Sequence, residues 1–460
     1  MNSKSFVESE TFIEKAQALR PFYFIVVCWG KRYSDYLLNY CIAALLSPNN
    51  IPALRNQGKN KFLIATTDED WDYMQSSPIF KLLSGYVEPI KILISLPPND
   101  LSPCIHMGLG HKLATQMAFN ANAYAVLLTP DLMVSDGTMA AVQRRAVENY
   151  HLFLVAALRF AEEPLFKHLQ DIHEENLKSQ SSERVCPISL SGRQMVSAGI
   201  KSFHSETLTY EWDAPYFSRF PVACWWKSIK GDGILVHSLS WAPLMIDYAA
   251  IKKHDTSTMD NWTIDGDYVY KNFGNSENVY VCKDSDECML ISWAPWDDKK
   301  ISTQPRKLLL NKFLSLWIKK VTLYDTFHNK VFDPLKQKLF YIPVYWHAND
   351  LDHEWNSLEK KAAAIIESSV GTKVRILQKS NFSISAIRYN LNYFVKELCF
   401  LIARASLRIN WFFRYYWEGK GRITMVIIKA LSGDPVARKR ISQHYYFFMN
   451  FMFGKDLKKK

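Results

Sequence analysis

The sequence lacks the short motifs that mark several large enzyme classes. It has no glycine-rich GxGxxG fingerprint, no Walker-type GxxxxGK and no GxSxG. Dinucleotide-dependent dehydrogenases, P-loop nucleotidases and serine hydrolases of the α/β type each depend on one of these motifs. Their absence excludes the usual forms of these three classes, so the function must be sought in other residues.

Closely spaced cysteine pairs are also absent. The eight cysteines are scattered, and the nearest two, Cys282 and Cys288, have five residues between them. Thiolate metal sites need ligands that are brought together, and disulfide scaffolds need a higher cysteine density. We therefore expect reduced and mostly buried thiols, which fits a cytoplasmic protein.

Long hydrophobic runs are missing as well. No stretch reaches the roughly 18 uncharged apolar residues that a spanning helix needs. Residues 1–20 are polar, with no basic segment followed by an apolar one. We therefore expect neither a transmembrane helix nor a signal peptide.

Residues 1–380 carry no net charge, and the positive charge of the chain is concentrated in residues 381–460. The chain has 56 basic and 45 acidic residues. Residues 381–460 contain 15 of the basic residues but only 4 of the acidic ones, together with 17 aromatic residues. Aromatic rings and basic side chains suit an anionic membrane surface, where each basic residue contributes about 1 kcal/mol. We expect a cytoplasmic protein that is peripheral to the inner face of the membrane. A helical segment packed on the body is the alternative, and nucleic-acid binding is less favoured.

Apolar runs alternate with helical patterns over the first 160 residues. The runs occupy residues 22–28, 61–66, 90–96, 124–128 and 152–158. This alternation predicts an α/β fold, with a sheet covered by helices on both faces. We divide the chain into a catalytic domain (1–300), a helical extension (301–380) and a basic aromatic tail (381–460), which is also expected to be helical.

Ligands of such sheets bind beyond the carboxyl ends of the strands, where the strand order reverses. One strand here, Tyr124–Leu128, leads directly into Thr129, Pro130 and Asp131. A carboxylate in this place can hold Mg²⁺ or Mn²⁺ on a diphosphate. Alternatively, Asp131 only caps backbone donors of a strand-to-helix turn.

Residues 111–118 and 124–131 together resemble the centre of the GT-A-fold glycosyltransferases, in which a helix leads into a strand ending in Asp-x-Asp. The resemblance extends over roughly residues 20–300. It implies a mixed sheet with helices on both faces, a nucleotide-sugar donor, and a glycan or lipid-linked acceptor of bacterial surface-glycan type. Here Thr129 replaces the first acid of the motif, so a strict requirement for Mn²⁺ or Mg²⁺ is in doubt.

The resemblance also suggests which residues bind the donor. Those expected near the base, ribose or diphosphate are Trp29, Gly30, Lys31, Thr66, Asp68, Lys112, Thr129 and Arg193. Lys112 and Arg193 are basic residues of the kind that replace a metal in some members. Asp131 and His237 are the expected metal ligands. A histidine that follows an apolar run, as His237 does, is also typical of a satisfied core residue.

Asp265 and Asp267 match the family's downstream acidic motif, which presents a carboxylate to the acceptor hydroxyl. If the reaction inverts the sugar, one of them acts as general base. An ordinary turn at Asp265-Gly266-Asp267 is the alternative.

Two other polar segments carry ligand-type side chains. Asp284-Ser-Asp286-Glu287 follows a strand, a pattern that favours a hairpin turn. Residues 347–353 contain His347, Asp350 and His353 without regular helical spacing, which favours an exposed loop. We therefore expect no metal site at either segment.

Two alternatives to glycosyl transfer remain open. A nucleotidyltransferase has a similar sheet and also uses a metal-bound diphosphate. A non-catalytic scaffold with a decayed site would explain why Thr129 stands where the motif has an acid.

Overall fold

The computed structural model describes residues 10–56, 58–98, 101–178, 187–264, 266–274, 276–298, 312–331 and 333–371. The predicted tail (381–460) and Asp265 lie outside the described residues. The sites considered below all belong to one compact unit, within residues 1–312 and 322–372.

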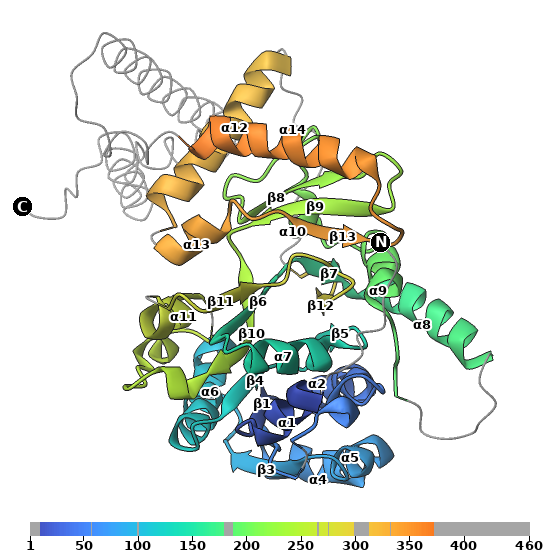
Figure 1. Cartoon of the computed structure of the whole chain (residues 1–460), viewed down its shortest axis with the longest axis vertical. Coiled ribbons are helices and arrows are strands. Elements are labelled where there is room, and N and C mark those ends of the chain that lie inside the picture. The colour runs from blue at the N-terminus through green and yellow to red at the C-terminus, as the bar shows by residue number, and fades with distance from the viewer. Residues whose placement is uncertain are drawn as a thin grey trace, which may run out of the picture. The chain divides into compact units, whose positions relative to one another are not determined.

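A seven-stranded mixed sheet, sheet A, forms the centre of the fold (Figure 1). Its order is β11 (Val279–Val281), β6 (Leu152–Ala156), β10 (Trp241–Asp247), β4 (Tyr124–Leu127), β1 (Phe22–Val27), β2 (Lys61–Thr66) and β3 (Glu88–Leu93). β10 is antiparallel to both of its neighbours, and the other pairs are parallel. The five apolar runs of the sequence are strands of this sheet, and the predicted α/β class is confirmed.

Alternate residues of the central strands enter two separate cores. On β1, Tyr23, Ile25 and Val27 join one cluster of buried residues. Phe24 and Val26, one residue out of phase, join the other cluster. Because side chains of a strand point to opposite faces in turn, the continuous apolar run serves both faces of the sheet.

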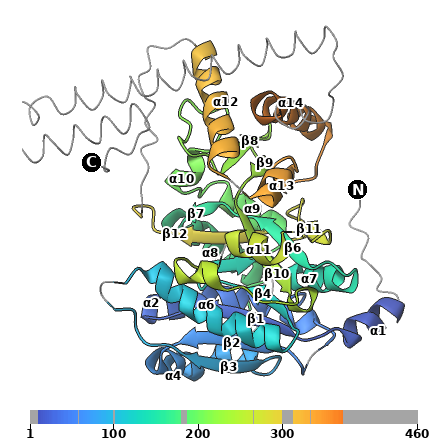
Figure 2. The ribbon, with the colours of Figure 1, turned by 90° about the vertical axis from the view of Figure 1, so that its left-hand side faces the viewer.

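Helices cover both of these faces. α6 (Pro103–Asn120) packs on the first core through Ala114 and Ala118, and Figure 2 shows it lying across β1 and β2. A Cβ atom at Gly110 would lie 2.7 Å from Val27 Cγ1, so this glycine permits the close approach of α6 to the sheet. The second core is covered by the helical segment 31–45 and by α5 (Pro78–Leu83).

Two smaller sheets adjoin sheet A. Sheet B contains β5 (Leu132–Val134), β12 (Leu290–Ala294) and β7 (Arg159–Ala161). Sheet C contains β13 (Val344–His347), β9 (Gly233–Ser238) and β8 (Ala223–Lys227). A third core, with Trp226, Leu235 and Phe340, lies between sheet C and α14 (His353–Val370).

The remaining helices connect these layers. They are α1 (Glu10–Ala18), α2 (Lys31–Tyr36), the π-helix η1 (Leu37–Ile42), α3 (Ala43–Leu45), the 3₁₀-helix η2 (Ile51–Ala53), α4 (Asp68–Ser76), α7 (Thr138–Val147), α8 (Glu162–Lys178), α9 (Gly192–Gly199), α10 (Ser205–Leu208), the 3₁₀-helices η3 (Tyr248–Ala250) and η4 (Ser257–Asp260), α11 (Gly266–Phe273), α12 (Lys312–Asn329) and α13 (Pro334–Leu339). Among the described residues, no helix is both long and apolar enough to cross a membrane.

Candidate functional site

The strand order reverses between β1 and β4. From β1 the chain moves outward through β2 to β3, and it then returns to the opposite side of β1 as β4. Parallel sheets bind ligands beyond the carboxyl ends of the strands at such a point. The residues that follow these ends are 28–31 after β1 and 128–131 after β4, so five sequence-predicted positions share this edge: Trp29, Gly30, Lys31, Thr129 and Asp131.

The loops after β1 and β2 are joined by the carboxylate of Asp70. The Gly30 N–H donates to Asp70 Oδ2 over 2.9 Å, and the Thr67 hydroxyl donates to the same oxygen over 2.7 Å. Gly30 has a φ of 81°, which glycine adopts without strain. Asp70 therefore fixes the shape of this edge, and its oxygens are occupied in doing so.

Thr66 and Asp68 lie close in sequence to Asp70, but they differ in their hydrogen-bond and ion-pair partners. The Thr66 hydroxyl is buried at the end of β2 and makes no hydrogen bond with the described residues. Asp68 begins α4 and forms an ion pair with Lys91 at 2.6 Å. Thr66 thus has a buried hydroxyl without a hydrogen-bond partner among the described residues, whereas Asp68 is paired with a residue of β3. Their roles in donor binding stay predictions.

Asp131 is the half-buried carboxylate at the end of the β4 loop. Burial raises the pKa of its carboxyl, and the Glu162 charge acts in the same direction. The Thr129 hydroxyl and the Arg159 charge partly offset this effect. The backbone N–H of Trp293 donates to the Asp131 carbonyl oxygen over 3.4 Å. The backbone of Asp131 is therefore tied to β12, while the charge of its side chain is only partly compensated.

Glu162, at the start of α8, forms a network with α2. It accepts a 2.5 Å hydrogen bond from the Tyr36 hydroxyl, and it forms an ion pair with Arg32 at 2.6 Å. Arg32 also donates to the Tyr36 oxygen over 2.7 Å. Both oxygens of Glu162 are used in this network, and its charge acts on the Asp131 carboxyl.

Aromatic residues line the rim of the same edge. The Trp29 ring packs edge-on against His106, with ring centroids 5.1 Å apart. Tyr33 is 46% exposed, and its pKa is raised by burial and by the Asp131 charge. Lys31 is exposed and lies over the Tyr73 ring. The rim therefore combines ring faces with the Lys31 ammonium, which donates to the Tyr73 hydroxyl over 3.0 Å and lies 3.6 Å from the Asp35 carboxylate.

Lys112 and Arg193 are already engaged by carboxylates. Lys112, on α6, forms an ion pair with Asp260. Arg193, on α9, pairs with Asp286 at 2.8 Å and with Asp350 at 2.7 Å. Donor binding by these two residues stays a prediction, and it would require them to leave these partners.

His237 lies on β9 in the core of sheet C. Its Nδ1–H donates to the Phe340 carbonyl over 2.9 Å, and burial lowers its pKa. Asp267, at the start of α11, is 73% exposed and lies 3.7 Å from Lys336 Nζ. The predicted roles of His237 as metal ligand and of Asp267 as base are not tested by these contacts.

An apolar cavity of about 320 Å³ adjoins sheet B. Met133, two residues beyond Asp131, lines it together with Tyr40 of the π-helix and Phe166 of α8. π-helical turns are frequent at functional sites. The cavity therefore lies beside the loop that carries Asp131 and has mainly apolar walls.

Sequence reasoning missed Arg159 and Glu162. Arg159 follows the predicted strand 152–158, and this position at a carboxyl end was the available clue. Glu162 offers no such clue, because its partners lie about 130 residues earlier in the chain. Only the packing of α8 against α2 brings these groups together.

No family model and no curated protein matches the chain. One similar solved structure is a Bacillus anthracis protein described as a glucose-1-phosphate thymidylyltransferase, in complex with a sucrose. It shares 14% identity and a TM-score of 0.20, over 31% of this chain and 57% of that chain. The chain thus spans little more than half of that protein. Its own fold is an α/β arrangement with a seven-stranded mixed sheet flanked by helices.

Proposed function

We propose that the chain is a glycosyltransferase that moves a sugar from a nucleotide-diphosphate donor to a glycan or lipid-linked acceptor. The observation that carries this proposal is Asp131, an incompletely compensated carboxylate beside the switch point of the sheet. Sites of this kind bind ligands in open α/β sheets, and partly compensated buried charges are common where chemistry occurs.

The donor would lie along the edge formed by the loops after β1, β2 and β4. Trp29 and Tyr33 present rings of the kind that stack on a nucleotide base. Lys31 and Arg159 supply positive charge for a diphosphate, and Arg159 already acts on the Asp131 carboxyl. The Thr66 hydroxyl adds a buried atom that is free to bond.

A divalent cation fits this edge only when the donor supplies further ligands. Asp131 and Thr129 offer one carboxylate and one hydroxyl, whereas the oxygens of Asp70 and Glu162 are used in hydrogen bonds. Asp131 and Thr129 are therefore the residues that would hold Mg²⁺ or Mn²⁺. When bound there, such a cation neutralises charge on a diphosphate leaving group.

The acceptor would approach from the side of sheet B. Met133 and Tyr40 line the apolar cavity near Asp131, and this surface suits the apolar part of a lipid-linked acceptor better than a free glycan. Asp265 or Asp267 remains the proposed base for the acceptor hydroxyl. Residues 381–460 remain the proposed contact with an anionic membrane surface.

Hydrolysis and transfer with a panel of nucleotide sugars, with and without Mn²⁺, test the proposal. We expect release of the nucleoside diphosphate from at least one donor, and loss of this release in Asp131→Ala. Asp171→Asn, an exposed carboxylate of α8, is the matched control. No turnover with any donor, or full turnover in Asp131→Ala, would contradict the assignment.

The same assay separates the alternatives. Release of pyrophosphate from a nucleoside triphosphate would identify a nucleotidyltransferase, and binding of a nucleotide sugar without turnover would identify a scaffold. Removal of residues 381–460 should abolish binding to vesicles that contain anionic lipid while donor binding is retained. Equal vesicle binding by the shortened chain would contradict the membrane contact.

A further inference from the structure

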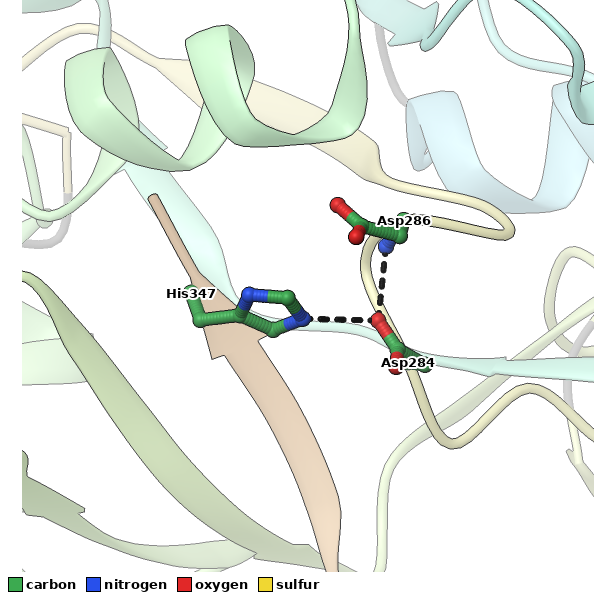
Figure 3. A group of neighbouring side chains, drawn as sticks. All are labelled: Asp284, Asp286 and His347. Atoms are coloured by element: carbon green, nitrogen blue, oxygen red, sulfur yellow. Dashed lines mark hydrogen bonds and ion pairs between the residues drawn. The ribbon is translucent and has the colours of Figure 1, made fainter. Parts of the chain in front are cut away.

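A turn and a strand that are distant in sequence bring three ligand-type side chains together. Asp284 and Asp286 lie on the turn between β11 and β12, and His347 ends β13. One ligand atom from each of the three residues lies within 4.8 Å of the others. Figure 3 shows the His347 ring pointing at the Asp284 carboxylate, with Asp286 on the same turn.

Backbone contacts fix the turn against the strand. The Tyr345 N–H donates to the Lys283 carbonyl over 2.7 Å, and the Ser285 N–H donates to the Tyr345 carbonyl over 3.0 Å. The Ser285 hydroxyl accepts from the His347 N–H over 3.1 Å. Because β11 and β12 belong to different sheets, the expected hairpin at this turn is wrong. The turn is instead docked on β13, and this contact brings the three side chains together.

The His347 ring is oriented for coordination. Its Nδ1–H donates to the Asn349 carbonyl over 2.7 Å, which leaves Nε2 facing Asp284 Oδ1 at 2.8 Å. Metal-binding histidines characteristically donate their other ring N–H to a carbonyl or carboxylate in this way. His347 is only 2% exposed, so its ring has little freedom to turn away.

The charge at this position is unbalanced. Asp284, Asp286 and Asp350 face a single guanidinium, that of Arg193, which binds the last two. A metal ion that took the place of the Nε2 proton would leave His347 neutral, and an excess of two negative charges would then remain in this group. Glu287, the fourth acid nearby, is neutralised separately by Arg145 and does not contribute. The excess matches the charge of one divalent cation.

We propose that Asp284, Asp286 and His347 form a binding site for a divalent transition-metal ion. Two carboxylates and one imidazole suit Zn²⁺ and similar ions, whereas Mg²⁺ and Ca²⁺ prefer oxygen ligands alone. The ion joins the β11–β12 turn to β13, and it therefore clamps sheet C to the rest of this unit. None of the three ligands is a residue of the Asp131 edge, so the inference does not depend on the proposed transfer reaction.

Zn²⁺ binding to the full chain, measured by equilibrium dialysis after treatment with a chelator, tests the site. We expect one equivalent of tightly bound Zn²⁺ and a higher melting temperature in its presence, with no such effect of Mg²⁺. Asp284→Asn and His347→Gln should each weaken binding by more than the roughly 10- to 100-fold that the loss of an orienting partner costs. His353→Gln, an exposed histidine close by in the sequence, is the matched control and should bind as the unchanged chain does.

A replacement variant and a spectroscopic measurement complete this test. If His347→Gln does not fold, Asp286→Asn replaces it, because Asp286 is 41% exposed and its loss leaves the core intact. Co²⁺ reports the ligand type, and we expect its visible absorption without the near-ultraviolet thiolate band that cysteine ligands produce. A thiolate band or the absence of Zn²⁺ binding would overturn the proposal. So would Zn²⁺ binding by Asp284→Asn and Asp286→Asn that is as tight as binding by the unchanged chain.

Discussion

Asp131 and Asp284 are two carboxylates in similar positions with opposite electrostatic surroundings. Each follows a strand of sheet A, and each is partly buried. Burial raises the pKa of Asp131, and its neighbours only partly offset this effect. Burial also favours the protonated form of Asp284, but the hydrogen bond from His347, the backbone N–H of Asp286 and the charges of His347 and Arg193 together outweigh it and leave the pKa of Asp284 below its ordinary value.

The difference lies in how much of each charge the protein itself compensates. Asp284 has an imidazole and a backbone N–H as partners, and this arrangement holds two parts of the chain together. Asp131 has the Thr129 hydroxyl, its own backbone N–H and the Arg159 charge, but together they do not outweigh burial, so its charge destabilises the folded state at neutral pH. Residues that lower stability in this manner are typical of functional sites, where a ligand supplies the missing compensation.

The sharpest test of this comparison is Asp131→Asn. We expect donor turnover to fall by about 100- to 1000-fold, the cost of losing one preorganised charge-stabilising group. The free energy of unfolding should stay the same or rise, because a poorly compensated buried charge has been removed. Turnover and chemical denaturation are measured together. A parallel loss of stability and activity would show that Asp131 is structural.

His111 extends the comparison to a buried base. Complete burial lowers its pKa from 6.5 to about 4, and its Nδ1 shares a 2.9 Å hydrogen bond with the Thr263 hydroxyl. Between these pH values the unfolded chain binds more protons than the folded one. Its free energy of unfolding should therefore decrease, by up to about 3 kcal/mol, as the pH falls from about 6.5 to about 4.

Chemical denaturation at about pH 7 and about pH 4.5 measures this effect. His111→Gln should show a smaller decrease in stability than the unchanged chain. His353→Gln, which replaces an exposed histidine, should retain the full decrease. Equal pH dependence in all three proteins would refute the burial effect.

Glu162 provides the comparison within the site itself, because it lies close to Asp131 but is fully paired. Glu162→Gln should lower the free energy of unfolding by about 1–3 kcal/mol, since Arg32 and the Tyr36 hydroxyl lose a charged partner. Tyr36→Phe should cost about 1 kcal/mol, since it removes one hydrogen bond. Thermal and urea unfolding measure both. Lower stability in Asp131→Asn than in Glu162→Gln would reverse the comparison.

Lys112 gives the smallest expected effect. In its ion pair with Asp260, the Lys112 side chain is 32% exposed and the Asp260 side chain is 55% exposed. Lys112→Ala should therefore lower the free energy of unfolding by less than about 1 kcal/mol. If Lys112 also binds the donor diphosphate, the KM for the donor should rise several-fold while stability hardly changes. An unchanged KM would remove Lys112 from the donor site.

Much of the central sheet could be predicted from local patterns. The apolar runs 22–28, 61–66 and 124–128 are long enough, and rich enough in branched and aromatic residues, to form buried strands. Their loops, which include Trp29 and Asp131, therefore lie at one edge whatever the rest of the chain does. The pairing of Glu162 with α2 could not be predicted, because no local pattern encodes a contact across about 130 residues.

The cluster of Asp284, Asp286 and His347 could not be predicted from local patterns either. Asp284–Glu287 and His347–His353 each have too few ligands at regular spacing, and the sequence favours an ordinary turn and loop. Pairing of β13 with β9, and docking of the turn on β13, place Asp284, Asp286 and His347 together.

The sequence by itself determined the α/β class, the central strands and the edge that carries Asp131. These features follow from burial patterns within short segments. The tertiary structure decided which charges are compensated and which are left for a ligand, as for Asp284 and Asp131. The physical reason is that compensation depends on groups only a few ångströms away in space, and strand pairing, not sequence distance, sets which groups these are.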